Sequence, residues 1–205
     1  MKPFSRLLMY LIVPALFTGC SSGPSKTIVN LKTAFNGEST ASAKYAAFAD
    51  KALAEGFDTI AVMFRATSMS ESIHASNHKK VLESMGVKAG NPEIGKFEVL
   101  STAENLADGI KGESYEIDEM YPGFIKTAET EANTDAVETF TYAIETEKKH
   151  KAFYVKALEV VKTGSEATLP IKWFVCPVCG NTYDEATLTD DCEFCMTSKS
   201  QYIAF

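Results

Sequence analysis

The sequence predicts a mainly α protein, a four-helix bundle followed by a small metal-binding domain of short β-strands. Four long segments repeat apolar residues every three or four positions, as helices do. Two Cys-x-x-Cys pairs lie together near the C-terminus. The 205 residues suffice for one ordinary domain and one small one. The formal net charge of -7 argues against nucleic acid as a partner, since phosphate binding needs a basic face.

The N-terminal segment is expected to be an export signal rather than part of the fold. Lys2 and Arg6 precede an apolar run over residues 7–17, too short to span a membrane but suitable for a signal peptide. The run ends in Leu-Phe-Thr-Gly-Cys, which resembles a bacterial lipobox with Phe17 where an aliphatic residue is usual. We therefore expect a lipoprotein signal peptide over residues 1–19 and lipidation of Cys20. A plain signal peptide, or an uncleaved anchor with an incidental cysteine, is the alternative.

Residues 20–26 then provide the lipidated cysteine and a flexible tether rich in Ser and Gly. Ser21, directly after the cysteine, is not the aspartate that often retains lipoproteins at the inner membrane. The expected location is the cell envelope, anchored to a membrane through the lipid on Cys20, with the outer membrane or periplasmic face favoured.

The four predicted helices are joined by two short loops and one long connection, which suits a bundle with a crossover. Asp58 is expected to cap the second helix, and Ser101 with Glu104 forms a capping box for the third. Pro122 should kink the third helix rather than end it. The helices are predicted over residues 27–55, 58–86, 101–131 and 135–162, with the crossing connection over 87–99. The bundle thus covers residues 27–163, and residues 164–205 form the linker and small domain.

Each predicted helix places acidic residues within its own apolar stripe. Residues three, four or seven apart share one helical face. The stripes are Leu31, Phe35, Glu38, Tyr45 and Phe48; Phe64, Thr67, Glu71, His74, His78 and Met85; Ile110, Glu113, Glu116, Met120 and Phe124; and Phe140, Ile144, Glu147, His150 and Tyr154. Burying a carboxylate is costly unless it is paired or binds a metal. One such glutamate is better explained as a surface residue, but four helices together indicate a metal site.

Two of these helices carry Glu-x-x-His, which places an oxygen and a nitrogen ligand one turn apart. The pairs are Glu71 with His74 and Glu147 with His150, while the other two helices supply Glu38 and the pair Glu113 and Glu116. A glutamate from each of two helices plus Glu-x-x-His from each of the others is the ferritin-like diiron pattern. Carboxylates with two imidazoles suit iron or manganese.

Three further residues on these faces have open roles. His78, one turn beyond His74, is either a ligand or a residue behind the ligands, and we favour the second role. Tyr45 and Tyr121 are either core aromatics or hydroxyl donors to the ligands and to bound oxygen species, and we favour positions beside the ligands. Together with Glu116, these two tyrosines are the candidate catalytic residues.

The cysteine segment predicts a second metal site. Cys176 and Cys179 are followed twelve residues later by Cys192 and Cys195, and two such pairs can close a tetrahedral sulfur site for Fe or Zn. Because an exported protein meets an oxidising compartment, two disulfides are the alternative. The Cys-Pro-x-Cys-Gly form of the first pair favours metal.

After the tether, the sequence resembles the rubrerythrin family. The resemblance is carried by motifs at residues 35–39, 71–75, 102–106, 112–116, 119–124 and 147–150, and by the cysteine pairs. It implies a rubredoxin-like C-terminal domain with one iron on Cys176, Cys179, Cys192 and Cys195. It also implies two irons in the bundle, held by Glu38, Glu71, His74, Glu113, Glu116, Glu147 and His150. Glu71 and Glu147 would bridge them, and Glu116 would move with its iron on a change of redox state.

The resemblance further implies a peroxidase that reduces hydrogen peroxide to water in oxidative stress defence. An external electron donor would feed the FeS4 site, which passes electrons to the diiron site. Family members usually pair head to tail, so we expect a homodimer at least, with the FeS4 site of one subunit near the diiron site of its partner. Two features depart from the family: Met196 stands where the second cysteine pair usually has glycine, and most relatives lack a lipobox.

Two other functions remain open. A ferritin-like ferroxidase would oxidise and hand on iron, and a zinc-ribbon domain on a structural bundle would serve binding alone. The rubredoxin-like domain distinguishes the first of these from a peroxidase, because an iron-storage protein has little use for a reducing relay.

Overall fold

The computed structural model describes residues 25–164 and 169–205. The predicted signal peptide, the lipidation site Cys20 and most of the tether lie outside these residues. In the described part of the chain, no helix combines the length and apolar character needed to cross a membrane.

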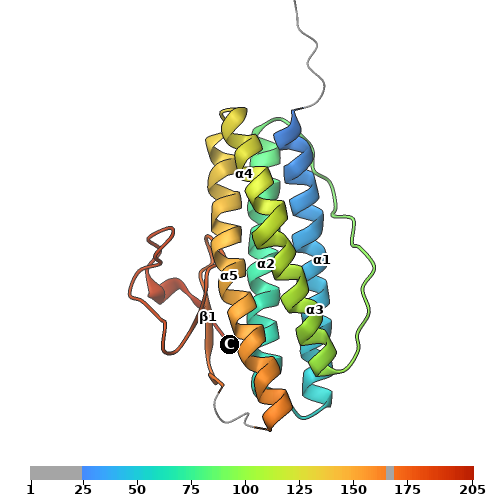
Figure 1. The fold of residues 1–205 in the computed structure, drawn as a ribbon. Coiled ribbons are helices and arrows are strands. Elements are labelled where there is room, and N and C mark those ends of the chain that lie inside the picture. Colours follow the sequence, from blue (N-terminus) through green and yellow to red (C-terminus); the bar gives the residue numbers. More distant parts are fainter. Residues whose placement is uncertain (1–24, 165–168) are drawn as a thin grey trace, which may run out of the picture.

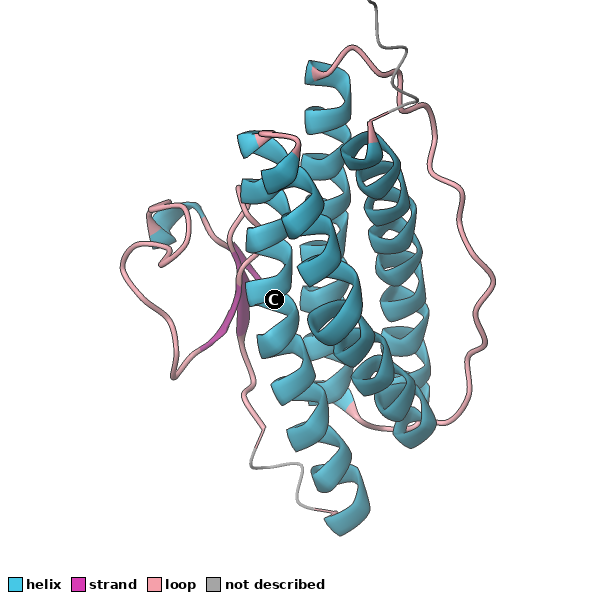
Figure 2. Cartoon of the chain, turned by 45° about the horizontal axis from the view of Figure 1, so that its top comes forward, coloured by secondary structure: helices cyan, strands magenta, loops and turns pink. Residues whose placement is uncertain are grey.

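The described residues form an elongated helical bundle with a small domain on one side, which confirms the predicted fold class (Figure 1). The bundle begins with α1 (Lys26–Ala54) and α2 (Asp58–Ser84), which turn sharply at Gly56 and pack along each other. A long connection then runs down the outside of the bundle before α3 begins (Figure 2). The remaining elements are α3 (Thr102–Tyr115), the π-helix η1 (Glu116–Met120), α4 (Tyr121–Thr130) and α5 (Thr134–Thr163).

Three of the helix starts carry a polar side chain as their cap. The side chains of Ser25, Ser101 and Asn133 accept hydrogen bonds from backbone N–H groups that have no partner inside the helix. The capping box of Ser101 and Glu104 is present as predicted. The prediction for Asp58 is wrong: Phe57 occupies the N-cap position, and Asp58 is the first helical residue, where its charge suits the positive end of the helix dipole.

The third predicted helix continues through Pro122, but it changes form one turn earlier. Within η1 the backbone widens, and the N–H of Tyr121 bonds to the carbonyl of Glu116, five residues back. Pro122 has no N–H, so it cannot complete the usual bond to the residue four positions earlier. The single π turn accommodates this loss without ending the helical path.

Two apolar clusters hold the bundle together, and the acidic residues lie between them along each helix. The cluster near the small domain includes Phe48, Phe64 and Tyr154. The cluster at the other end includes Phe35 and Phe140. Glu71 falls after Phe64 along α2, and Glu147 falls between Phe140 and Tyr154 along α5, so hydrophobic packing brackets the carboxylates. The carboxylates therefore depend on packing at both ends of the bundle.

The small domain is an antiparallel sheet of order β2-β1-β3 that lies against α2 and α5. Its strands are β1 (Trp173–Val175), β2 (Thr182–Asp184) and β3 (Ile203–Ala204), and a short 3-10 helix, η3 (Lys199–Gln201), precedes β3. Trp173 packs edge-on against Phe153 of α5, with ring centroids 4.6 Å apart. Phe194 stacks on Tyr142 of the same helix. Apolar contacts at two places thus attach the domain to the bundle.

Replacing either of two glycines, one in α3 and one in α4, by alanine should change the free energy of unfolding in opposite directions. A Cβ at Gly109 would meet the Tyr154 ring at 2.8 Å, whereas a Cβ at Gly123 meets nothing within 4 Å. Gly109→Ala should lower the free energy of unfolding by about 1–3 kcal/mol through overpacking. Gly123→Ala should raise it by about 0.5–1 kcal/mol, because alanine loses less backbone entropy in a helix. Chemical denaturation of both variants measures the difference, and equal effects would contradict the packing.

Candidate metal centres

Two groups of four side chains meet in the middle of the bundle, and they share two members. Glu38, Glu71, His74 and Glu147 form one group, with ligand atoms all within 4.8 Å of one another. The other group contains Glu71, Glu113, Glu147 and His150 within the same distance. Glu71 and Glu147 belong to both groups. This arrangement suits two metal ions side by side, bridged by these two carboxylates.

Both histidines turn the same ring nitrogen toward the shared carboxylates. Nδ1 of His74 lies 2.9 Å from Glu71 Oε2 and 3.0 Å from Glu147 Oε1. Nδ1 of His150 lies 2.7 Å from Glu147 Oε2 and 3.1 Å from Glu71 Oε1. The i, i+3 spacing within α2 and within α5 places each histidine beside its own glutamate, and the packing of the helices brings the two pairs face to face.

The donor atoms fit metal ions because several of them have no hydrogen-bond partner. One oxygen each of Glu38 and Glu113 is buried without one, and the oxygens of Glu71 and Glu147 face only the two imidazoles. Such orphaned groups are costly in a protein interior unless a cation satisfies them. Carboxylate oxygens with two imidazoles are the donor set of ferritin-like diiron proteins. The site therefore fits two irons.

Crowding of the carboxylates shows in their pKa values. Burial, together with repulsion from Glu71 and Glu147, holds the pKa of Glu38 well above its usual range, and the same causes act on Glu113. Although burial opposes the change, His150 and His74 lower the pKa of Glu71 to about 2. Burial also opposes a raised value for His150, but Glu71 and Glu147 raise its pKa to about 10. Binding of a cation would replace protons held at such groups.

Tyr45 and Tyr121 lie beside the ligand groups, in positions where each hydroxyl reaches a carboxylate. Tyr45 donates a 2.7 Å hydrogen bond to Glu113 Oε1, and Tyr121 donates to Glu38 Oε1. Each tyrosine therefore fixes the orientation of a carboxylate. His78 is completely buried outside both groups and contacts Tyr121 instead of a ligand.

Glu116 is the predicted ligand that the structure leaves outside both groups. It lies half-buried in η1, on the wall of a cleft of about 490 Å³ whose lining also includes Tyr45, Gly37 and Lys44. Burial and the charges of Glu38 and Glu147 hold the pKa of Glu116 well above its usual value. Tyr45, which shares this wall, donates to Glu113, so the cleft borders the ligand groups.

The four cysteines of the small domain come together as one group, and none forms a disulfide. Sγ of Cys176 lies 3.5 Å from that of Cys195, and the Sγ atoms of Cys179 and Cys192 are also 3.5 Å apart. Tetrahedral coordination with metal–sulfur bonds of about 2.3 Å implies sulfur–sulfur edges of about 3.8 Å, whereas a disulfide bond is about 2.05 Å long. The spacing fits one iron in a rubredoxin-like site.

The two cysteine turns are not equivalent. Gly180 follows the first pair with φ of 85°, and Met196 follows the second with φ of 60°. The N–H groups of both residues bond back to the carbonyl of the first cysteine of their own pair. Glycine adopts this conformation without strain, whereas methionine is strained there. The Met196 side chain itself is 71% exposed, so only the backbone is affected.

The cysteine domain contacts both histidines of the bundle site at their outer nitrogens. Nε2 of His150 lies 3.0 Å from Thr182 Oγ1. Gly180 lies so close to His74 that a Cβ would be 2.5 Å from Nε2. Two hydrogen bonds hold this contact: Ser70 Oγ donates to the Gly180 carbonyl at 2.6 Å, and Asn77 donates to the Val178 carbonyl at 2.8 Å.

The residues of this contact could not be found from sequence reasoning. Gly180 and Thr182 are separated from His74 and His150 by long stretches of chain, and no periodicity connects them. The one available signal is the glycine after the first cysteine pair, which indicates a turn but not what the turn packs against.

The fold and the two sites together define a non-haem diiron protein with an additional four-cysteine iron site. The Rubrerythrin family model matches residues 30–158, and the chain belongs to that family. Nigerythrin of Nitratidesulfovibrio vulgaris is 34% identical over 87% of this chain and 86% of its own. Rubrerythrin-2 of Clostridium acetobutylicum is 32% identical over 85% of this chain and 94% of its own.

Solved structures agree with these relatives. Nigerythrin in its fully reduced, all-ferrous state superposes with a TM-score of 0.79 at 32% identity, covering 93% of this chain and 91% of that one. The likeness therefore extends over the bundle and the cysteine domain alike. The protein is a diiron oxidoreductase of the rubrerythrin type.

Replacing a shared glutamate should cost more iron than replacing an unshared one. Glu71→Ala should lose both bundle irons, because Glu71 belongs to both groups, leaving about one iron per chain in the cysteine site. Glu38→Ala should lose chiefly the iron next to His74, leaving about two. Glu145→Ala is the control and should keep all three, because Glu145 lies in the same helix as Glu147 but is half-buried and pairs with Lys148. Metal analysis after anaerobic purification measures the content. Equal losses in Glu71→Ala and Glu38→Ala would contradict the shared positions.

Proposed function

We propose that the protein is a peroxidase that reduces hydrogen peroxide to water in oxidative stress defence, with electrons from an external donor arriving by way of the rubredoxin-like site. The observation that carries this proposal is the contact between the cysteine domain and both histidines of the bundle site. An iron-storage protein or a structural bundle has no need of a cysteine metal site held against its diiron ligands. In the proposed reaction this contact would be the path of electrons between the two sites.

Two ferrous irons held by the bundle glutamates and histidines would supply the two electrons that cleavage of one O–O bond consumes. The protein's own groups would position the substrate and the ligands. The cleft lined by Glu116 and Tyr45 admits a molecule as small as peroxide. Tyr45 and Tyr121 hold the carboxylates of Glu113 and Glu38 in place, and burial excludes bulk water from the site. A direct catalytic role for Glu116, Tyr45 and Tyr121 stays a prediction.

The proposal also includes a membrane anchor and a homodimer. Lipid on Cys20 would attach the protein to the cell envelope, with the outer membrane or periplasmic face favoured. The N-terminus of α1, which follows the tether, lies at the opposite end of the bundle from the α1–α2 turn (Figure 1). Within one chain the cysteine domain already contacts its own bundle. Two copies that exchange their C-terminal domains would make the same contacts between subunits. Labelled fatty acid should be incorporated into the wild-type protein and not into Cys20→Ser, and absence of label from the wild type would exclude the lipid anchor.

A variant that separates the two sites tests the peroxidase proposal. Gly180→Leu introduces a side chain where His74 lies, so the cysteine domain should move away from the bundle. Steady-state peroxide reduction with an artificial donor should fall by at least about tenfold, because electron transfer weakens steeply with distance. Oxidation of the pre-reduced diiron site by one equivalent of peroxide should keep its rate. Stopped-flow absorption under anaerobic conditions measures both.

Val178→Ala is the matched control, since its exposed side chain lies on the same turn and only its carbonyl bonds to the bundle. Iron content and the visible spectrum establish that the cysteine site is intact in each variant. Unchanged turnover in Gly180→Leu would refute the relay. A fully ferrous protein that does not react with peroxide would refute the peroxidase, and a ferritin-like ferroxidase would then be the better explanation.

A further inference from the structure

His78 is a buried group that neither the diiron ligands nor the cysteine site uses. Its side chain is fully buried in α2, and it belongs to neither ligand group. It packs against the rings of Tyr121 and Phe140. Both of its ring nitrogens nevertheless have a polar neighbour. Nε2 lies 3.2 Å from the Tyr121 hydroxyl, and Nδ1 lies 3.1 Å from the Thr139 hydroxyl.

These contacts extend into a chain of four groups that ends on a ligand carboxylate. The Tyr121 hydroxyl donates to Glu38 Oε1, so its oxygen is free to accept from His78 Nε2–H. Burial lowers the pKa of His78 to about 3, so the ring is neutral and its other nitrogen is an acceptor. The Thr139 hydroxyl then donates to Nδ1. Each donor in this series of hydrogen bonds therefore points toward the next group on the way from Thr139 to Glu38.

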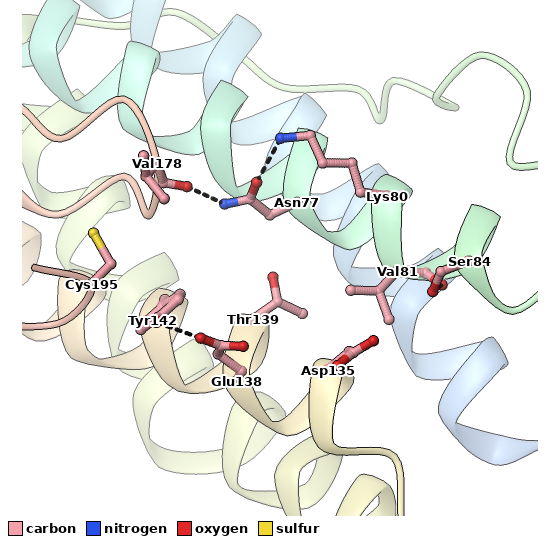
Figure 3. Close-up of a pocket in the computed structure, with 10 residues that line it drawn as sticks. All are labelled: Asn77, Lys80, Val81, Ser84, Asp135, Glu138, Thr139, Tyr142, Val178 and Cys195. Carbon is pink, nitrogen blue, oxygen red and sulfur yellow. Dashed lines mark hydrogen bonds between the residues drawn. The ribbon is translucent and has the colours of Figure 1, made fainter. Parts of the chain in front are cut away.

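The outer end of this hydrogen-bonded chain borders a surface cleft. Thr139 lines a cleft of about 510 Å³ between α2, α5 and the cysteine domain, shown in Figure 3. The acids Asp135 and Glu138 and the amine of Lys80 line the same cleft. Thr139 is 6% exposed, whereas Tyr121 and His78 are 0% exposed. The hydrogen-bonded chain thus begins at the wall of this cleft and ends at Glu38.

We propose that Thr139, His78 and Tyr121 form a proton route from this cleft to Glu38 at the diiron site. The inference rests on the proposed function, since reduction of one hydrogen peroxide to two waters consumes two electrons and two protons. Each transfer moves one proton. A proton enters at Thr139 while the Thr139 proton passes to Nδ1, the Nε2 proton passes to the Tyr121 oxygen, and the Tyr121 proton passes to the Glu38 side. His78 changes from the Nε2–H to the Nδ1–H tautomer without becoming charged. Rotation restores the hydroxyls of Tyr121 and Thr139, and the imidazole must return to its Nε2–H tautomer before a second proton can pass.

Removal of one hydroxyl tests the route without disturbing the contact between His78 and Tyr121. Thr139→Val keeps the shape of the side chain but cannot donate to Nδ1. Oxidation of the pre-reduced protein by peroxide should slow by at least about tenfold, the scale typical of a lost proton-transfer group. The solvent deuterium isotope effect should rise, and Thr139→Ser should restore the wild-type rate. Thr141→Val, which loses only a bond to the backbone of Val137 on the exposed face of α5, is the matched control.

A second measurement does not depend on turnover. The chain has only three histidines, so nitrogen NMR of the full-length protein, loaded with diamagnetic Zn²⁺, should resolve each ring. His78 should be protonated on Nε2, with Nδ1 accepting a hydrogen bond that disappears in Thr139→Val. Protonation on Nδ1, or an unaltered Nδ1 signal in that variant, would overturn the route.

The kinetic outcomes distinguish failure of the proton route from failure of the proposed peroxidase function. Wild-type protein that reacts with peroxide, together with Thr139→Val that reacts equally fast, overturns the route alone. A purely structural His78 predicts this result, because its bond to Tyr121 is retained. Wild-type protein that does not react with peroxide refutes the proposed function, and the route then has no reaction to supply.

Discussion

Repulsion among glutamates buried at one level of the bundle is the constraint on which the other features depend. Glu38, Glu71, Glu113 and Glu147 are each within 1% of complete burial, with only two imidazoles to offset them. Such a group is tolerable because cations replace the missing counter-charge. The apolar clusters on either side supply the packing that keeps the four helices together around it. The apolar clusters at the two ends therefore stabilise the bundle, while the glutamates and histidines between them bind metal.

The histidines connect the two metal sites because an imidazole has two nitrogens on opposite edges. For His74 and His150, Nδ1 faces the shared carboxylates while Nε2 faces the cysteine domain. A partner on the outer nitrogen fixes the tautomer and the ring orientation of a metal-binding histidine. The docking of the small domain therefore does more than bring two sites together. It also holds His150 in a defined orientation through Thr182, whereas Nε2 of His74 packs against the backbone at Gly180 without a hydrogen bond.

Sequence reasoning reached the helices and the carboxylates because both obey the helical period. Glu38, Glu71 and Glu147 could be placed inside the bundle from their spacing alone. The π turn at Glu116–Met120 could not, because it results from a balance between the lost N–H of Pro122 and packing on both sides of it. Phe57 replaced Asp58 as the cap because the tight turn at Gly56 sets where α2 begins. The roles of Thr139 and Gly180 follow only from their tertiary contacts with His78 and His74 of α2, which no local sequence pattern encodes.

The missing side chain of Gly180 has a consequence for how related chains can be compared. A Cβ at this position would overlap the ring of His74, so the close seat of the cysteine domain is available only to glycine. In a relative with any larger residue after its first cysteine pair, this domain must lie farther from the bundle. Alternatively, the domain of another subunit packs there in a different orientation. The residue at this one position therefore determines how closely the cysteine domain can approach the bundle. It does so whether or not the metal ligands themselves are present.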